Sequence, residues 1–246
     1  MKISTLVISE KGRRKNNEDN AIVLENERAI LLILCDGMGG HEGGEYASKI
    51  TVETFKEKFE DDQIPEDDAD LRRWFMDGLS EANGRMKEFA LKDYALFDMG
   101  TTFVSALFIK DENSLFFCNV GDSRAYLYSD YFYQITEDQN MLNFFINKQN
   151  MTYDEASGMP SAHYLTSSLG PKKTYEPVFS KYENVNNIKY IFLSSDGIHD
   201  YVQKPIMENI LFQKDSNLVQ KAQQLIQTAY NNNSSDNMTI AILEVE

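Results

Sequence analysis

The chain has 246 residues, of which 42% are hydrophobic, and this is enough for one globular domain with a sizeable core. Asp and Glu outnumber Lys and Arg by 39 to 24, so the formal net charge is −15 and a nucleic-acid backbone would be repelled. The N-terminal stretch MKISTLVISEKGRRK lacks the apolar core of a signal peptide. No apolar run approaches the roughly 18 residues of a membrane span. We therefore expect one cytoplasmic domain over 1–246, without a nucleic-acid or membrane partner.

Most of the predicted elements are short strands. Apolar runs rich in Val, Ile, Leu and Phe predict strands at 20–26, 29–35, 101–109, 114–120, 124–129, 189–195 and 238–245. Helical spacing of apolar residues predicts two consecutive helices at about 44–60 and 67–92, and a third through residues 218–229. The helix pair separates early strands from later ones, which favours helical layers outside sheets over strict strand-helix alternation. The fold expected is a layered α/β or α+β sandwich.

One segment interrupts the strand pattern. Residues 139–165, QNMLNFFINKQNMTYDEASGMPSAHYL, mix apolar residues with Gly, Pro and Ser. Such an irregular insertion between strands predicts a flap beside a functional site. The acidic stretch EDDQIPEDDAD at 60–70 is interpreted as a solvated connection.

Four acidic residues lie at strand ends. Asp36, Asp122 and Asp196 each follow a predicted strand, Asp236 precedes one, and the first three adjoin a glycine. A carboxylate at a strand end projects from the rim of the sheet, and a glycine lets the backbone approach a bound group. Several converging acids would repel one another unless a cation neutralised them. All-oxygen ligands favour Mg²⁺ or Mn²⁺, and two such ions roughly 3.5–4 Å apart would polarise a water molecule and hold the groups of an in-line displacement.

Two simpler interpretations of these motifs exist. A single Asp-Gly after a strand is usually only a turn, but four such sites in one chain favour a shared role. Gly37, Gly39 and Gly43 loosely match a dinucleotide-binding fingerprint. No Gly-Lys-Ser/Thr follows, a ribose-binding acid is missing, and Asp36 would repel a phosphate unless a metal lay between them.

Eight segments together resemble one protein family. In chain order they are RRKNNEDN, LCDGMGGHEGGEYAS, MGTTFVSALF, NVGDSRAYLY, ITEDQN, LTSSLG, IFLSSDGIHDYV and SSDNMTIAILEV. They resemble the motifs of the metal-dependent serine/threonine protein phosphatases, the PPM or type 2C family, in its compact bacterial form. The resemblance covers nearly the whole chain. It implies an α+β fold, a four-layer αββα sandwich of two antiparallel sheets flanked by helix pairs, with a metal cleft at one edge.

The resemblance also implies a set of metal ligands. By position, Asp36 would bridge two Mn²⁺ or Mg²⁺ ions, and the carbonyl of Gly37 would complete the first. Asp196 and Asp236 would hold the second ion, and Asp122 with Asp196 would form a third, weaker position. A metal-bound hydroxide would then attack phosphorus directly, without a phosphoenzyme intermediate. The partners implied are phosphorylated proteins, among them a serine/threonine kinase and its substrates, and we expect a monomer by analogy.

Further roles follow from the same resemblance. Glu18 and Asp19 would orient metal-bound waters, and Arg14, with Arg13 as the fallback, would bind the phosphate through its guanidinium fork. The leaving-group proton donor stays open, because many eukaryotic members have a histidine where this chain has Met38.

Several features depart from the family or leave a choice. The two nearby histidines, His41 and His199, are interpreted as structural. The flap region reads ITEDQN and GMPSAHYLTSSLG, which differs from the family pattern and leaves its substrate contacts undefined. The acidic surface favours basic phosphopeptides.

A rival interpretation places the chemistry on a thiol. CNVGDSR at 118–124 fits Cys-x-x-Gly-x-x-Arg, the phosphate loop of cysteine-dependent phosphatases, with Cys118 as nucleophile and Arg124 as phosphate ligand. Asp122 would then lie inside the anion cradle, and the residues after Arg124 continue as a strand instead of a helix. A buried core cysteine is therefore favoured. The other alternative is a catalytically inactive regulatory module, against which the intact acids argue.

Overall fold

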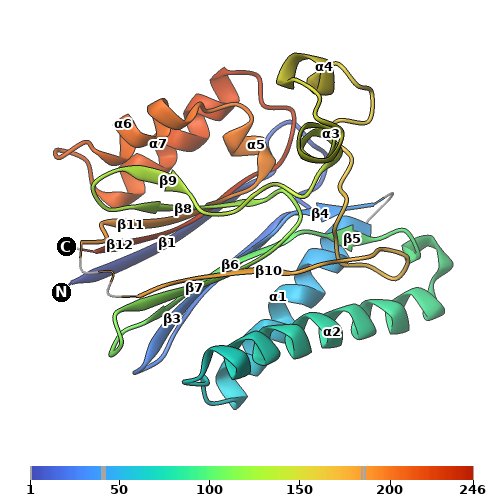
Figure 1. Cartoon of the computed structure of the whole chain (residues 1–246), viewed down its shortest axis with the longest axis horizontal. Helices are drawn as coiled ribbons and strands as arrows, with labels where there is room; N and C mark the ends of the chain where they lie inside the picture. Colours follow the sequence, from blue (N-terminus) through green and yellow to red (C-terminus); the bar gives the residue numbers. More distant parts are fainter. Residues whose placement is uncertain (1, 40–42, 184, 186, 246) are drawn as a thin grey trace.

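The computed structural model describes residues 2–39, 43–183, 185 and 187–245, and most of their strands form two stacked antiparallel sheets (Figure 1). The first sheet has the order β1-β12-β11-β8-β9, with bounds Ile3–Glu10, Met238–Val245, Tyr190–Ser194, Arg124–Tyr128 and Phe132–Gln134. The second has the order β10-β7-β6-β3-β2, with bounds Val178–Tyr182, Ser114–Val120, Phe103–Ile109, Ala29–Cys35 and Asn20–Glu25. A short pair, β4 (Gly37–Met38) and β5 (Gly100–Thr101), completes the described strands.

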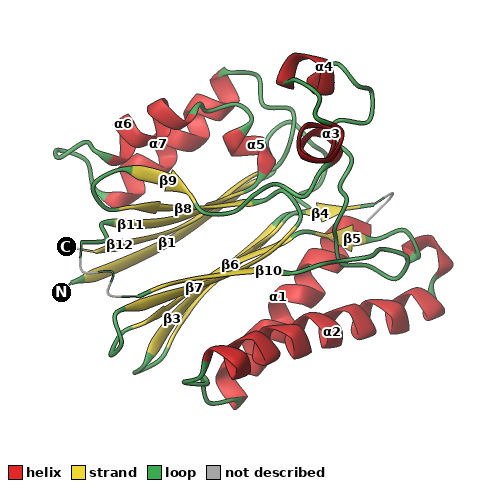
Figure 2. Cartoon of the chain, viewed as in Figure 1, coloured by secondary structure: helices red, strands yellow, loops and turns green. Residues whose placement is uncertain are grey.

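Helices cover the outer face of each sheet (Figure 2). The second sheet carries α1 (Gly43–Asp61) and α2 (Asp68–Lys92), and the first carries α5 (Asp196–His199), α6 (Lys204–Leu211) and α7 (Leu218–Asn231). The short helix η1 (Tyr94–Leu96) follows α2, while α3 (Met141–Gln149) and α4 (Tyr153–Ser157) lie at one end of the sandwich. These layers confirm the predicted sandwich of two antiparallel sheets flanked by helices. No helix in the described part of the chain is long and apolar enough to cross a bilayer.

The two faces of β3 show why its sequence is a continuous apolar run. Leu31 and Ile33 pack into the core beneath α1 and α2, whereas Ile30, Leu32 and Leu34 pack into the core between the sheets. All five are fully buried. Because alternate residues of a strand point to opposite faces, a strand with a core on each side has no polar face.

The helix pair was predicted to within one residue at each end. The caps explain where α2 begins, because the Asp67 side chain accepts a hydrogen bond from the Ala69 N–H and acidic residues fill the first turn. The inner faces of α1 and α2 meet the sheet through aromatic contacts. Phe55 stacks on Phe103 at 4.5 Å, and Phe75 stacks on Phe116 at 5.6 Å between ring centroids.

Other segments differ from the expectations. The predicted strand 101–109 is two strands, β5 and β6, because Thr102 leaves the ladder and donates its N–H to the Asp36 carbonyl at 2.9 Å. Strands β1, β4, β9 and β10 were not predicted, although β1 pairs along its whole length with β12. The segment predicted as a flap contains α3 and α4, and an isolated bridge between Asn140 and Leu165 joins its two ends.

Candidate metal centre

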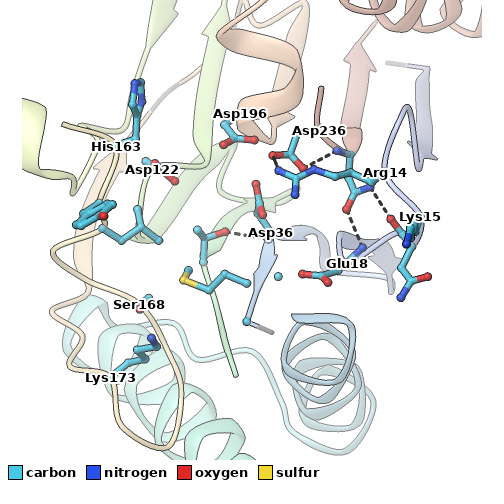
Figure 3. Close-up of a pocket in the computed structure, with 18 residues that line it drawn as sticks. Arg14, Lys15, Glu18, Asp36, Asp122, His163, Ser168, Lys173, Asp196 and Asp236 are labelled. Carbon is cyan, nitrogen blue, oxygen red and sulfur yellow. Dashed lines mark hydrogen bonds and ion pairs between the residues drawn. The ribbon is translucent and has the colours of Figure 1, made fainter. Parts of the chain in front are cut away.

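Four acidic residues lie at one edge of the sandwich, where strands of both sheets begin or end (Figure 3). Asp36 follows β3, Asp122 lies in the turn between β7 and β8, Asp196 follows β11, and Asp236 precedes β12. Antiparallel pairing brings the strand ends together, because the end of β11 lies beside the start of β12. The four line a cleft of about 840 Å³, here called the acid cleft, whose other lining residues are Arg14, Lys15, Asn16, Glu18, Gly37, Met38, Gly39, Thr102, His163, Tyr164, Leu165, Ser168, Lys173 and Asn237.

The backbone of Asp36 is fixed by the threonine pair that interrupts the next strand. Its N–H donates to Thr102 Oγ1, and its carbonyl accepts from Thr101 Oγ1, each at 2.9 Å. The adjacent Gly37 has no room for a side chain, since a Cβ there would lie 2.2 Å from the Gly44 carbonyl oxygen and 2.4 Å from that of Glu18. Gly37 therefore allows its own backbone and those of Glu18 and Gly44 to pack closely together beside Asp36.

Close backbone packing also positions Asp196 and Asp236. A Cβ at Gly197 would lie 1.9 Å from the Asn237 carbonyl oxygen, so the start of α5 packs directly on the segment before β12. The Asn237 side chain accepts from the Glu18 N–H and donates to the carbonyls of Lys11 and Asn16. This asparagine, to which the sequence reasoning gave no role, ties the N-terminal loop to the two acids.

The carboxyl groups are buried close together, and this raises their pKa values. Burial raises the pKa of Asp36 well above its usual value, and the charges of Asp19, Asp196, Asp122 and Asp236 raise it further. Burial raises the pKa of Asp19 to about 7 and that of Asp196 to about 6. The pKa of Asp122 is also raised well above its usual value, by burial and then by Asp196. Without a cation, such a cluster retains protons near neutral pH.

The donor set fits a hard divalent cation. Asp196 Oδ1 and Asp19 Oδ2 are buried and have no hydrogen-bond partner among the described residues. Carboxylate and carbonyl oxygens are the ligands that Mg²⁺ and Mn²⁺ prefer. As they lie, no three His, Cys, Asp or Glu side chains in the described ranges have the spacing of a complete ligand set. The Asp196 carboxyl instead hydrogen-bonds to Asp36 and that of Asp236 to Arg14, so a cation would compete with these two contacts.

The two acids of the N-terminal motif occupy different positions. Glu18 lines the acid cleft, and its carboxylate packs against Gly44 in the first turn of α1. A Cβ at Gly44 would lie only 2.2 Å from Glu18 Oε2. Burial raises the pKa of Glu18. Asp19 is 8% exposed and accepts hydrogen bonds from the side chains of Thr239 and Ser195. Asp19 therefore lies behind the cleft surface.

Of the two arginines considered as phosphate ligands, only Arg14 lines the acid cleft. Its Nη2 donates to Asp236 Oδ2 at 2.5 Å and its Nε donates to the Ser235 carbonyl at 3.0 Å. The Arg13 guanidinium lies 4.8 Å above the Tyr230 ring and donates to that residue's carbonyl, near the end of α7.

The wall opposite Arg14 was not identified from the sequence. His163 and Ser168 line it, and Lys173 lies in the turn that follows (Figure 3). The sequence offered two signals for this wall, the flap predicted at 139–165, which contains His163, and the segment LTSSLG, which contains Ser168, but neither indicates a side-chain direction.

The two histidines discussed as proton donors have separate outcomes. His199 is buried, its Nδ1 lies 2.9 Å from Ser194 Oγ, and burial with the nearby Arg124 charge lowers its pKa well below the usual value. It is a neutral structural histidine away from the cleft surface. His41 lies outside the described residues.

The Cys-x-x-Gly-x-x-Arg segment does not form a phosphate loop. Cys118 is fully buried within β7, and burial raises the pKa of its thiol well above the usual value, so the thiolate is disfavoured. Arg124 begins β8 and makes a bidentate ion pair with Asp138, with its Nε 2.9 Å from Oδ1 and its Nη2 2.6 Å from Oδ2. The arginine is engaged and the cysteine is a core residue.

Comparison with known proteins identifies relatives over nearly the whole chain and solved structures with the same fold. Residues 10–239 match the family model described as "Protein phosphatase 2C". The "Serine/threonine phosphatase stp" of Listeria welshimeri is 30% identical over 239 residues, which cover 96% of this chain and 93% of that protein. The crystal structure of the serine/threonine phosphatase Stp1 from Staphylococcus aureus has a TM-score of 0.88 and 31% identity, covering 100% of this chain and 96% of the other. The catalytic domain of the phosphatase PstP in complex with two manganese ions has a TM-score of 0.82 and 28% identity, covering 98% of this chain and 97% of the other.

The fold and the match over almost the whole chain define the class of protein. The chain belongs to the protein phosphatase 2C family. It is a serine/threonine protein phosphatase.

Proposed function

We propose that the chain hydrolyses phosphoserine and phosphothreonine in proteins with the help of two divalent cations held in the acid cleft. The observation that carries the proposal is the convergence of Asp36, Asp196 and Asp236 from different strand ends into one buried cluster. Asp36 would bridge the ions with the Gly37 carbonyl beside it, and Asp196 and Asp236 would hold the second ion. Asp122, whose pKa the charge of Asp196 helps to raise, would share a third position with that residue.

Divalent ions bound there polarise a water molecule and offset negative charge on the phosphoryl group. The manganese-bound phosphatase with the same fold supports Mn²⁺ as an ion for this site. Glu18, on the cleft surface, would hold a water by hydrogen bonding, and Asp19 would act from behind it. Arg14 would bind two phosphate oxygens through its guanidinium, since its side chain is 56% exposed and therefore accessible to substrate. The protein partners would be phosphoproteins, including a serine/threonine kinase and the proteins that it phosphorylates.

The first test measures phosphate release from a phosphothreonine peptide in Mn²⁺, in excess chelator, and in Mn²⁺ after thiol alkylation of the native protein. We expect activity in Mn²⁺ and its loss in chelator. The clustered carboxyl groups can all be ionised only when a cation offsets their mutual repulsion. Alkylation should leave the activity intact, since Cys35 and Cys118 are both fully buried. Activity that survives chelator and is abolished by alkylation would contradict the proposal.

A further inference from the structure

Lys173 places a positive charge on the wall of the acid cleft opposite Arg14, the residue proposed to bind the phosphate. Its side chain lines the cleft, and Figure 3 shows Asp36 between it and the pair formed by Arg14 and Lys15. The chain as a whole carries a net charge of −15, so this single ammonium group is opposite in sign to the net charge of the molecule. A peptide that presents its phosphate to the acids at the centre would extend toward one or both walls.

The backbone that carries Lys173 is anchored to two elements. Leu169 and Thr101 exchange backbone hydrogen bonds of 2.9 and 3.0 Å, which attach the turn to β5. The Gly170 N–H donates to Oδ1 of Asn83, a buried residue of α2, at 2.9 Å. The Lys173 N–H closes the turn by donating to the Gly170 carbonyl at 3.2 Å. The turn is therefore held at a fixed position relative to the cleft.

Two glycines leave room for the lysine stem. Gly170 has a φ of 151°, and a Cβ there would lie 2.8 Å from Lys173 Cγ. A Cβ at Gly100 would lie 3.4 Å from Lys173 Cε. The methylene chain of Lys173 thus packs on the backbone at Gly100 and Gly170, and this packing holds the ammonium group at the cleft wall. Because the side chain is already ordered, it loses less entropy when it binds a partner.

The ammonium group has an exchangeable partner. Its Nζ lies 3.1 Å from Asp98 Oδ1, and the Asp98 side chain is 74% exposed. An ion pair with so exposed a carboxylate is weak, because water screens the two charges. A carboxylate from a bound peptide can therefore replace Asp98 at little cost.

We propose that Lys173 is a specificity-determining residue that binds an acidic side chain near the phosphorylated residue of the substrate. The inference rests on the proposed function, because it concerns the peptide bound in that same cleft. It assigns a local preference for an acidic residue at the position that reaches this wall. The overall negative charge of the molecule favours basic peptides elsewhere, so the preference is confined to one part of the sequence around the phosphate.

The test compares phosphothreonine peptides in which each flanking position in turn is Glu or its neutral isostere Gln. At the position that reaches Lys173, we expect kcat/KM in Mn²⁺ to be about two- to fivefold higher for Glu, as an exposed ion pair would give. The gain should appear in KM, because the contact is remote from the reacting phosphorus. Lys173→Gln should reduce the Glu/Gln ratio to about 1. Asp98→Asn should raise the ratio, since it removes the competing carboxylate.

Lys172→Gln is the matched control. Its ammonium lies 4.9 Å from the centre of the Phe97 ring and the residue does not line the acid cleft, so this variant should keep the wild-type ratio. Hydrolysis of the Gln peptides with no Glu preference at any position would overturn the role of Lys173 alone. The same follows if Lys173→Gln keeps the preference, or if Lys172→Gln loses it equally. Failure to hydrolyse any peptide in Mn²⁺ would overturn the proposed function as well.

Discussion

The pKa of Asp36 is raised by burial and, in addition, by four other carboxyl groups in and behind the acid cleft. Replacing Asp36 with Asn removes its carboxyl group and keeps the size of the side chain. In excess chelator we expect Asp36→Asn to raise the melting temperature, since the metal-free fold no longer buries a carboxyl group that must take up a proton to lie among the other acids. In Mn²⁺ we expect phosphatase activity to fall about 100-fold or more.

Thermal melting and peptide hydrolysis on the same preparation measure both effects of this substitution. Asp77→Asn is the control, because Asp77 is an exposed acid on α2 outside the cleft lining. It should change neither quantity. A lower melting temperature of Asp36→Asn in chelator would show that the buried Asp36 carboxyl group does not destabilise the metal-free protein.

The raised pKa values of Asp19 and Asp196 predict how the metal-free protein responds to pH. Their folded values are about 7 and about 6, against a reference value of 3.8. Between about pH 4 and pH 7 the folded protein therefore binds more protons than the unfolded chain, so the free energy of unfolding decreases as pH rises. Urea unfolding in chelator at about pH 5 and pH 7 measures the slope. Asp196→Asn should flatten it, and a free energy that increased over this range would show that the cluster does not retain its protons.

At the scale of single residues, the sequence contained a local signal for the acids of the cleft. For the wall opposite Arg14 it gave no side-chain direction. Asp36, Asp122 and Asp196 each combine a strand end with a neighbouring glycine, so their convergence could be predicted. Lys173 and His163 lie in irregular segments, where nothing in the local pattern indicates side-chain direction. Their position at the cleft depends on distant contacts such as that between Gly170 and Asn83.

At the scale of elements, α2 offers a matched pair of glycines. A Cβ at Gly84 meets nothing within 4 Å, whereas one at Gly78 would lie 2.7 Å from Cζ of Phe55 on α1. We expect Gly84→Ala to stabilise the protein by about 0.5–1 kcal/mol, the helix-propensity difference. Gly78→Ala should destabilise it by about 1–3 kcal/mol because it overpacks the contact between the two helices.

Chemical denaturation of the two variants tests how closely α1 and α2 are packed. Phosphatase activity should follow the wild type in Gly84→Ala, because Gly84 lies outside the acid cleft. If Gly78→Ala were as stable as Gly84→Ala, the close approach of Phe55 would not restrict this position.

The elements that could be predicted are those with a strong periodic pattern. β3, β7 and β12 are apolar through most of their length because they have packing partners on both faces, and their bounds agree with the structure to within one residue. The edge strands β1 and β10 are mostly half-buried, and β10 contains a lysine and a serine. Their assignment depends on pairing with β12 and β7, which are far away in the sequence. The split between β5 and β6 likewise depends on Thr102 binding Asp36, a contact without a local signal.

At the scale of the whole molecule, the acid cleft lies where the two halves of the sandwich meet. Asp36 comes from the sheet covered by α1 and α2, whereas Asp196 and Asp236 come from the sheet covered by α5, α6 and α7. The halves are joined between the sheets by a core that includes Leu32 and Leu193. At the cleft edge, carboxyl groups from both halves repel one another instead. Without a cation, the acids at this edge therefore stabilise the contact between the two sheets less than the apolar core does.

This arrangement predicts that divalent cations stabilise the whole fold. A cation bound by acids from both sheets joins the two halves and is released on unfolding, so it adds RT ln(1 + [L]/Kd) to the free energy of unfolding. At about 100 times Kd, this is about 2.7 kcal/mol, or an increase in melting temperature of about 5–10 °C for a chain of this size. Calorimetry over a Mn²⁺ titration measures it, with NaCl of equal ionic strength as the control.

The variants separate this bridging effect from general binding to an acidic surface. Asp36→Asn and Asp236→Asn each remove a carboxylate from one side of the cleft, so both should lose most of the increase in melting temperature. Asp77→Asn should retain it, because that acid lies on α2 away from the cleft. An increase that persisted in both cleft variants would mean that Mn²⁺ stabilises the protein through other acids. Its loss in only one of them would show that a single sheet holds the cation and that the two halves are not joined through it.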